Sequence, residues 1–133
     1  MVSEKKRNIL SDLKKVYCRI KCSPIAGVGV FAVRDIPKNT NPFPSSLQKW
    51  YQFHISDFTD IKEGVMEMIK DFFVVENDGK VLIPEHGLNG MDISFFLNNS
   101  SKPNVRTKDG FIFFTKKEIK KGEELTVSYR SYC

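Results

Sequence analysis

The sequence predicts a mainly β domain of the α+β class, with several small sheets and two peripheral helices. Many short runs of β-branched and aromatic residues are bounded by Gly, Pro, Asn or Asp, which is typical of strands and their turns. Two other segments repeat apolar residues at helical spacing. A chain of 133 residues fits one compact domain. We therefore treat residues 1–133 as a single domain.

Both predicted helices begin after a residue that can cap a helix. The first predicted helix, residues 3–16, has Ser3 as its N-cap. It carries apolar residues at helical spacing and contains no Pro or Gly. Residues 60–73 show the same spacing, with Asp60 as N-cap and Glu63 three residues later, as in a capping box. Two amphipathic helices are therefore expected.

The predicted strands are short and are separated by turn-forming residues. A turn with Pro24 and Gly27 joins the first two strands into a hairpin, and three prolines make residues 36–44 an irregular connection. Asn77, Asp78 and Gly79 form the turn of a second hairpin. The predicted strands are residues 17–21, 28–33, 73–75, 80–83, 95–97, 105–107, 111–115 and 125–129.

Two segments of the chain are similar to each other. Residues 31–36 and 114–119 each read as a strand that runs into a bend holding lysine. The similarity is too short and too divergent to establish an internal duplication, so chance is the alternative.

Composition excludes several classes of protein. Hydrophobic residues make up 41% and charged residues 28%, so a packed core is expected. No uncharged apolar run approaches the roughly 18 residues of a membrane span, and no secretory signal opens the chain. We expect an intracellular protein, cytoplasmic or nuclear. The three cysteines fit neither an even disulfide framework nor a four-ligand zinc site, so we expect no metal.

The net charge of +5 is concentrated in lysine clusters near residues 5–7, 14–21 and 116–121. Such clusters attract acidic partners or nucleic acid. The plainer interpretation is solvated faces of a helix and a turn. Because no interleaved surface aromatics form a recognition signature, direct nucleic-acid binding is not expected.

Three patterns could bind a ligand, and each has a plainer interpretation. Gly27 and Gly29 would let the backbone approach a nucleotide-like group, but a glycine pair is more often a plain turn. Residues 98–104 hold three amides and two hydroxyls, which suit a zwitterionic or adenine-bearing ligand, although a turn-rich loop is the alternative. Tyr129 needs a partner for its hydroxyl if it is buried, in a site or in an ordinary core.

The order of the three patterns along the chain favours a functional interpretation over the plainer ones. The patterns are Gly-x-Gly-Val-Phe-Ala at residues 27–32, Phe-Leu-Asn-x-Ser-x-x-Pro-Asn at 96–104, and Gly-Glu-Glu-Leu-Thr-x-x-Tyr at 122–129, the most specific of the three. In this order they resemble the SET domain family of protein-lysine methyltransferases. The resemblance covers about residues 17–132. The N-terminal helix, residues 1–16, and a variable insert, residues 48–79, carry no family signature.

The resemblance implies a SET-type fold and a set of roles. In this family the last strand threads a loop to form a C-terminal pseudoknot. This arrangement brings residues 98–104, which we term the Asn loop, together with Tyr129. The cofactor is S-adenosylmethionine. Tyr129 is the implied catalytic residue. The implied cofactor contacts are the backbone of Ala26, Gly27 and Val28, beside the methionine part of the cofactor. Asn98 and Asn99 would hold its amino end and its adenine.

Two departures from the family pattern affect the expected site. The family usually has His after the first Asn of the loop and Cys after the Ser, whereas this chain has Asn99 and Ser101. No cysteine-rich segment follows Tyr129. Tyr132 is expected to close the lysine channel in its place, or a partner subunit completes the channel in a homodimer.

The expected reaction is an in-line transfer of a methyl group to an uncharged lysine amine. A narrow aromatic and apolar channel beside a cationic sulfonium disfavours the ammonium form of the lysine and so lowers its pKa. Phe43, Val127 and Tyr132 are the candidates for its walls, and Tyr129 would orient the amine. The expected partner is a protein bearing the target lysine, such as a histone tail.

Two other functions remain open at this stage. A catalytically weak SET-like binding module would hold the cofactor or a basic tail without methyl transfer, and Asn99 and Ser101 motivate this alternative. The less favoured alternative is a basic nucleic-acid-binding β domain. Cofactor binding without transfer would favour the first, and salt-sensitive DNA binding unaffected by cofactor would favour the second.

Overall fold

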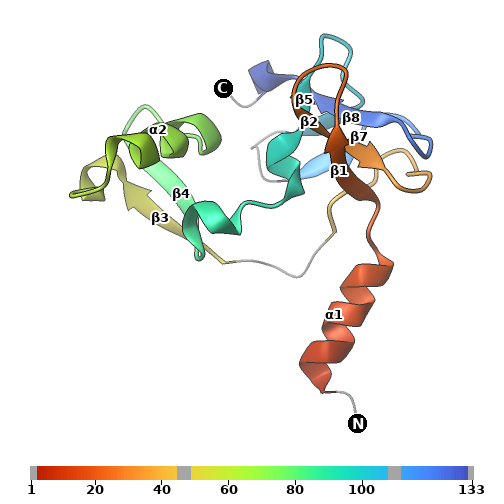
Figure 1. Ribbon diagram of the computed structural model, residues 1–133, viewed down its shortest axis with the longest axis horizontal. Helices are drawn as coiled ribbons and strands as arrows, with labels where there is room; N and C mark the ends of the chain where they lie inside the picture. The colour runs from red at the N-terminus through yellow and green to blue at the C-terminus, as the bar shows by residue number, and fades with distance from the viewer. Residues whose placement is uncertain (1–2, 45–48, 108–111, 132–133) are drawn as a thin grey trace. The chain divides into compact units, whose positions relative to one another are not determined.

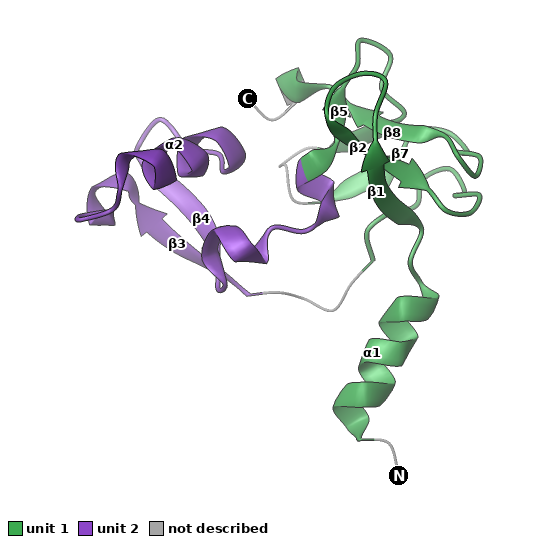
Figure 2. Ribbon diagram, in the orientation of Figure 1, with its two compact units in different colours: residues 1–46, 96–133 green, residues 47–95 purple. Residues whose placement is uncertain are grey.

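The computed structural model describes residues 3–44, 49–107 and 112–131. The chain divides into two compact units, which Figure 2 colours separately. Unit 1 comprises Met1–Ser46 and Phe96–Cys133, and unit 2 comprises Leu47–Phe95. The expected variable insert, residues 48–79, lies inside unit 2, which continues sixteen residues further along the chain.

Unit 1 is built on a four-stranded sheet that joins the two ends of the chain. Its order is β1 (Cys18–Cys22), β2 (Val28–Ala32), β8 (Glu124–Val127) and β5 (Asn98–Asn99). Strand β8 is antiparallel to β2 and parallel to β5. Figure 1 shows the C-terminal strand in blue beside strands from the start of the chain. This pairing places the Asn loop next to the final motif, as the expected pseudoknot requires.

Unit 1 also contains a small second sheet and the N-terminal helix. Strands β6 (Val105–Thr107) and β7 (Phe113–Thr115) pair antiparallel. Helix α1 (Glu4–Lys14) begins after Ser3, whose side chain accepts a hydrogen bond from the Lys6 backbone N–H at 3.2 Å. The predicted Ser3 cap is therefore confirmed. Among the described residues, no helix has the length and apolar character needed to cross a bilayer.

Two segments of unit 1 lie antiparallel against each other and form what we term the paired ribbon, residues 32–40 and 115–123. Ile36 and Ile119 exchange backbone hydrogen bonds of 2.7 and 2.9 Å, and both side chains are fully buried. Three residues after each isoleucine, Asn39 and Gly122 take positive φ angles of 58° and 91°. The similarity noticed in the sequence therefore corresponds to two similar turns that pair with each other.

A buried threonine hydroxyl fixes one end of the paired ribbon. Thr115 is fully buried, and its Oγ1 donates to the Pro37 carbonyl at 2.6 Å. The same oxygen accepts from the Thr40 backbone N–H at 3.0 Å. Around it lies the apolar core of unit 1. The core residues exposed by 2% or less are Val30, Ile36, Leu97, Val105, Ile119, Leu125 and Val127.

Unit 2 is a two-stranded sheet with one helix. Strands β3 (Trp50–His54) and β4 (Lys80–Pro84) pair antiparallel, and α2 (Glu63–Phe72) supplies Ile69 to a core shared with Phe73 and Val81. Trp50 and Phe95 stack with their ring centroids 6.3 Å apart. Strand β3 was not among the predicted strands; it pairs with β4, about thirty residues further along the chain.

Several predicted boundaries are wrong, each for a local reason. Helix α2 begins at Glu63, not at residue 60, because Asp60 has a positive φ of 58° that no α-helix accommodates. Strand β8 ends at Val127, and Tyr129–Ser131 form a 3₁₀ turn instead of a strand. Tyr129 therefore does not share a strand face with Val127.

The predicted strands around the Asn loop and the central hairpin also need correction. Residues 93–96 form a 3₁₀ turn, and strand pairing begins at Asn98, inside the predicted loop. In the predicted strand 73–75, only Val75 is paired, by a single bridge to Val81. Residue 111 of the predicted strand 111–115 lies outside the described residues, and β7 begins at Phe113.

Burial makes one of the cysteines chemically inert. Cys18 is 5% exposed, its Sγ lies 3.7 Å from the Pro42 carbonyl oxygen, and burial raises the pKa of its thiol to about 12. A thiol with a raised pKa carries little thiolate at neutral pH. Cys18 therefore acts as a core residue, whereas Cys22 at the other end of β1 is exposed.

Replacing the Thr115 hydroxyl should destabilise the protein. Thr115→Val leaves the Pro37 carbonyl and the Thr40 N–H without their buried partner, so the free energy of unfolding should fall by about 1–3 kcal/mol. Urea unfolding measures the change. Thr59→Val is the matched control, because Thr59 is exposed and its substitution should change stability by about 0.5 kcal/mol or less. Equal stabilities of the two variants would contradict the role of Thr115.

Candidate functional site

The connection between β1 and β2, residues 23–27, forms a tight loop that we term the hairpin loop. The Ser23 backbone N–H donates to the Gly27 carbonyl at 2.9 Å, and the Ser23 Oγ accepts from the Ile25 N–H at 3.0 Å. Gly27 has a φ of +45°, and nothing described lies within 4 Å of the position where a Cβ would stand. Glycine is favoured there by conformation, and the loop leaves open space beside it.

The amide of Asn98 ties the hairpin loop to β5. Its Nδ2 lies 3.2 Å from each of the carbonyl oxygens of Ala26 and Val28, and Asn98 is only 9% exposed. The same nitrogen also faces the Ser23 Oγ at 3.1 Å and a Glu124 carboxylate oxygen at 2.8 Å. Since all four neighbours accept hydrogen bonds, the amide nitrogen must point toward the loop. The Oδ1 atom points the other way.

A carboxylate completes this network. Glu124 is half-buried at the start of β8, and its two oxygens accept from the Ser23 hydroxyl at 2.8 and 2.9 Å. One of them also accepts from Asn98. We term Ser23, Asn98 and Glu124 the polar network. It joins the hairpin loop, β5 and β8, three segments far apart in the sequence.

Ser23 and Glu124 were missed as site residues in the sequence. Glu124 belongs to the final motif and could have been singled out as its second acid. Ser23 carries no comparable signal, because its bond to Glu124 joins residues 101 positions apart. Asn104, the last residue of the Asn loop, has a structural role, since its side chain accepts from the Thr126 N–H and donates to the Glu124 carbonyl.

Tyr129 is held against the other side of β5. Its backbone N–H donates to the Asn99 Oδ1 at 2.8 Å, and its hydroxyl donates to the Leu97 carbonyl at 2.7 Å. The Ser100 N–H bonds the Val127 carbonyl at 3.0 Å. Tyr129 remains 42% exposed. The expected proximity of the Asn loop and Tyr129 is thus present in the structure.

The three residues expected to line a lysine channel have different environments. Phe43 is half-buried, and its ring packs edge-on against Phe113 with the centroids 5.7 Å apart. Val127 is fully buried in β8, opposite Asn99 in the strand register. Tyr132 lies outside the described residues. In the described part of the chain, no group of three or more His, Cys, Asp and Glu residues is arranged to hold a metal ion.

With this geometry established, a comparison with known families assigns the chain. The family model of the SET domain matches residues 27–130. This range contains Gly27, the last residue of the hairpin loop, together with the Asn loop and Tyr129. The chain belongs to the SET domain family. The fold expected from the sequence, several small sheets with few helices, is also confirmed by similar solved structures.

Two of these similar solved structures come from different organisms. One is a Plasmodium falciparum protein named as a candidate histone methyltransferase, with a TM-score of 0.56, 19% identity, and coverage of 86% of this chain and 93% of that chain. The other is a humanized mutant of the Chaetomium thermophilum Polycomb Repressive Complex 2 bound to the inhibitor GSK126, with a TM-score of 0.55 and 21% identity. There the match covers 86% of this chain and 15% of that chain. No curated protein matches this SET domain chain.

The close packing around Gly29 should make it intolerant of a side chain. A Cβ at Gly29 would overlap the Glu124 carboxylate and lie 3.0 Å from the Asn98 Nδ2. Gly29→Ala should push that carboxylate out of the polar network and lower the free energy of unfolding by about 1–3 kcal/mol. Chemical denaturation measures the loss.

The control for this substitution is Gly64→Ala in α2. The space around a Cβ there is open, so stability should be unchanged or raised by about 0.5–1 kcal/mol. If Gly29→Ala were as stable as the control, the polar network would not be tightly packed against β2.

Proposed function

We propose that this SET domain transfers a methyl group from S-adenosylmethionine to the side chain of a lysine in a protein substrate. One observation carries the proposal: residues 97–99 are bonded to the hairpin loop through Asn98 and to Tyr129 through Leu97 and Asn99. The hairpin loop and the expected catalytic tyrosine are therefore both hydrogen-bonded to one short segment, residues 97–99.

The residues around the hairpin loop suit the proposed cofactor. The space beside Gly27 is open, and Asn98 and Glu124 offer an amide oxygen and a carboxylate. Since the Asn98 nitrogen faces the loop, its Oδ1 is oriented to accept from an ammonium group. S-adenosylmethionine carries both an ammonium and a cationic sulfonium, which a nearby carboxylate stabilises. Ala26, Gly27, Val28, Asn98 and Asn99 are the residues that would hold it.

The protein's task in this reaction is to position an uncharged amine. When bound, the cofactor supplies an electrophilic methyl group on a sulfonium. Tyr129, held by Asn99 and Leu97, would place its ring and hydroxyl beside the incoming lysine. Phe43, Val127 and Tyr132 are proposed to exclude water from the lysine channel, and exclusion of water favours the neutral amine that can attack. A partner subunit completing the channel remains an alternative to Tyr132.

The excess of acidic residues in this chain lies in unit 2. Residues 47–95 contain nine Asp and Glu residues but only four Lys and no Arg. A surface with excess negative charge attracts positively charged chains and raises their association rate. The proposed substrate is a protein segment that bears the target lysine, of which a histone tail is one example. The similar Plasmodium falciparum protein is also named for histone methylation.

Removal of the Tyr129 hydroxyl should abolish most activity. Tyr129→Phe keeps the ring volume but loses the hydroxyl, so turnover should fall about 100-fold or more. Transfer of a labelled methyl group to a panel of histones and lysate proteins measures the effect. The variant loses one hydrogen bond to Leu97, so the free energy of unfolding should fall by only about 1 kcal/mol.

Two outcomes would count against the proposed mechanism. Normal turnover by Tyr129→Phe would exclude a role for the hydroxyl. Binding of S-adenosylmethionine by the unsubstituted protein with no transfer to any protein in the panel would instead indicate a SET-like binding module without catalysis. Calorimetric titration with the cofactor distinguishes these outcomes from a failure to bind.

Asn99 offers a separate test, because it stands where the family usually has His. Its side chain accepts from the Tyr129 N–H, so Asn99→Ala should misplace Tyr129 and lower kcat about 10-fold or more. Asn99→Asp keeps the acceptor oxygen and should restore most of the turnover. Steady-state kinetics with varied cofactor separates kcat from KM. A rise in the KM for the cofactor with kcat unchanged would show that Asn99 acts on the cofactor and not through Tyr129.

A further inference from the structure

The charge of the chain is unevenly divided between its two units. Unit 1 carries 17 of the 21 Lys and Arg residues and only seven of the 16 Asp and Glu residues. Its excess of ten positive charges is twice the net charge of the whole chain, because unit 2 is acidic. The proposed methyl transfer does not require so basic a unit.

Part of this charge is gathered by the paired ribbon. One segment contributes Arg34 and Lys38, and the other contributes four lysines; all six side chains are exposed. Antiparallel pairing holds the two segments together along their length. At one end the Gly122 N–H donates to the Ala32 carbonyl at 2.9 Å, and at the other end the Asn39 N–H donates to the Thr115 carbonyl at 2.9 Å. The four lysines are Lys116, Lys117, Lys120 and Lys121.

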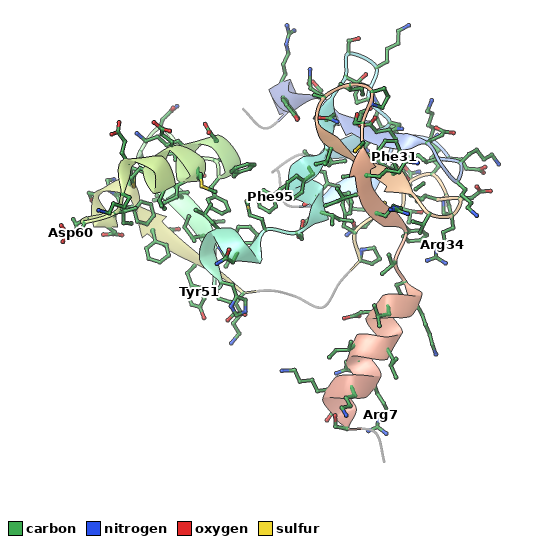
Figure 3. All side chains as sticks on the ribbon, in the orientation of Figure 1. Arg7, Phe31, Arg34, Tyr51, Asp60 and Phe95 are labelled. Carbon is green, nitrogen blue, oxygen red and sulfur yellow. The ribbon has the colours of Figure 1, made fainter. Side chains whose placement is uncertain are left out.

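The ribbon also carries Asp35, Glu118 and Glu123, but among the described residues only one of the six cations forms an ion pair. Lys120 forms ion pairs with Glu118 and, at 3.8 Å, with Asp35. The hydrogen bond to Glu118 and the two negative charges raise the pKa of Lys120. The remaining five cations have no ion pair in that part of the chain. Arg34 stacks its guanidinium 4.0 Å from the centre of the Tyr17 ring, and Figure 3 shows it at the edge of unit 1.

The ribbon has the chemistry of a phosphate-binding surface more than that of a protein interface. Within residues 32–40 and 115–123, no large hydrophobic side chain is exposed. Protein interfaces usually depend on buried aromatic or aliphatic anchors, whereas binding to a nucleic-acid backbone requires mainly Lys and Arg. The hydrogen-bonded pairing keeps these cations on one rigid element, which lowers the entropy cost of binding.

We propose that the paired ribbon binds the phosphate backbone of double-stranded nucleic acid, independent of base sequence. The contacts are made by Arg34, Lys38, Lys116, Lys117 and Lys121. The sequence alone did not favour nucleic-acid binding, because it lacks stacking aromatics. Contacts to phosphates need none, since phosphate oxygens are recognised by charge and by N–H donors.

The test is fluorescence anisotropy with a labelled 20-base-pair DNA duplex over a series of salt concentrations, without cofactor. The logarithm of the binding constant should fall linearly with the logarithm of salt concentration, with a slope of about −4 for four or five phosphate contacts. Replacing Lys38, Lys116, Lys117 and Lys121 by Gln should reduce that slope by about one per lysine. At low salt, the affinity should fall at least about 100-fold.

A matched variant removes the same charge from unit 2. It replaces Lys49, Lys62, Lys70 and Lys80 by Gln, so both variants have the same net charge. This control should keep its affinity for DNA and its salt slope. Equal loss in both variants, or full binding by the ribbon variant, would overturn the proposal. Circular dichroism checks that both are folded.

Two further binding experiments identify the class of ligand. Two duplexes of unrelated sequence should bind with the same affinity, because the contacts are to phosphates. Competition by poly-glutamate as effective as that by DNA would indicate an acidic protein partner and overturn the assignment to nucleic acid. Methyl transfer is not measured in these experiments, so their outcome is independent of the proposed enzymatic activity.

Discussion

Strand β8 is hydrogen-bonded on both of its edges, and the candidate site depends on that position. On one edge it meets β2 through Val30 and Phe31, and on the other it meets β5 through Asn98 and Asn99. Its first residue, Glu124, bonds Ser23 and Asn98, and the turn after its last residue brings Tyr129 to Leu97. Four residues of strand thus connect the hairpin loop, the Asn loop and the tyrosine. Loss of this strand would remove the sheet pairing that supports the direct bonds among the three.

The residue that follows Asn98 departs from the family pattern and makes a defined contact in this chain. SET domains usually have His where this chain has Asn99. Here the Asn99 side chain accepts the Tyr129 N–H, a bond that fixes the start of the last turn. An amide oxygen is a better acceptor for this purpose than a ring nitrogen whose role depends on its tautomer. The substitution therefore has a structural explanation within β5 and its neighbours.

Features that depend on nearby residues could be predicted from the sequence. The Ser3 cap of α1 and the first hairpin follow from residues within a few positions of each other. The start of α2 could not be predicted, because the sequence gives no sign that Asp60 adopts a left-handed conformation. Strand β3 and the bond between Ser23 and Glu124 depend on contacts over about thirty and 101 positions. The roles expected for Tyr129, Asn98 and the hairpin loop rest on the order of three motifs, not on the local pattern of any one of them.

The parallel pairing of β5 with β8 has a consequence for how the protein is made. Residues 98 and 99 leave the ribosome well before residues 126 and 127, and the hairpin of β1 and β2 leaves much earlier still. Contacts between distant residues form slowly, because the entropy cost of closing a long loop comes before any stabilising contact is made. A nascent chain that stops short of Glu124 would hold the hairpin loop with neither this carboxylate nor Tyr129 in place. The polar network, which needs both Asn98 and Glu124, would then form only after β8 has been made.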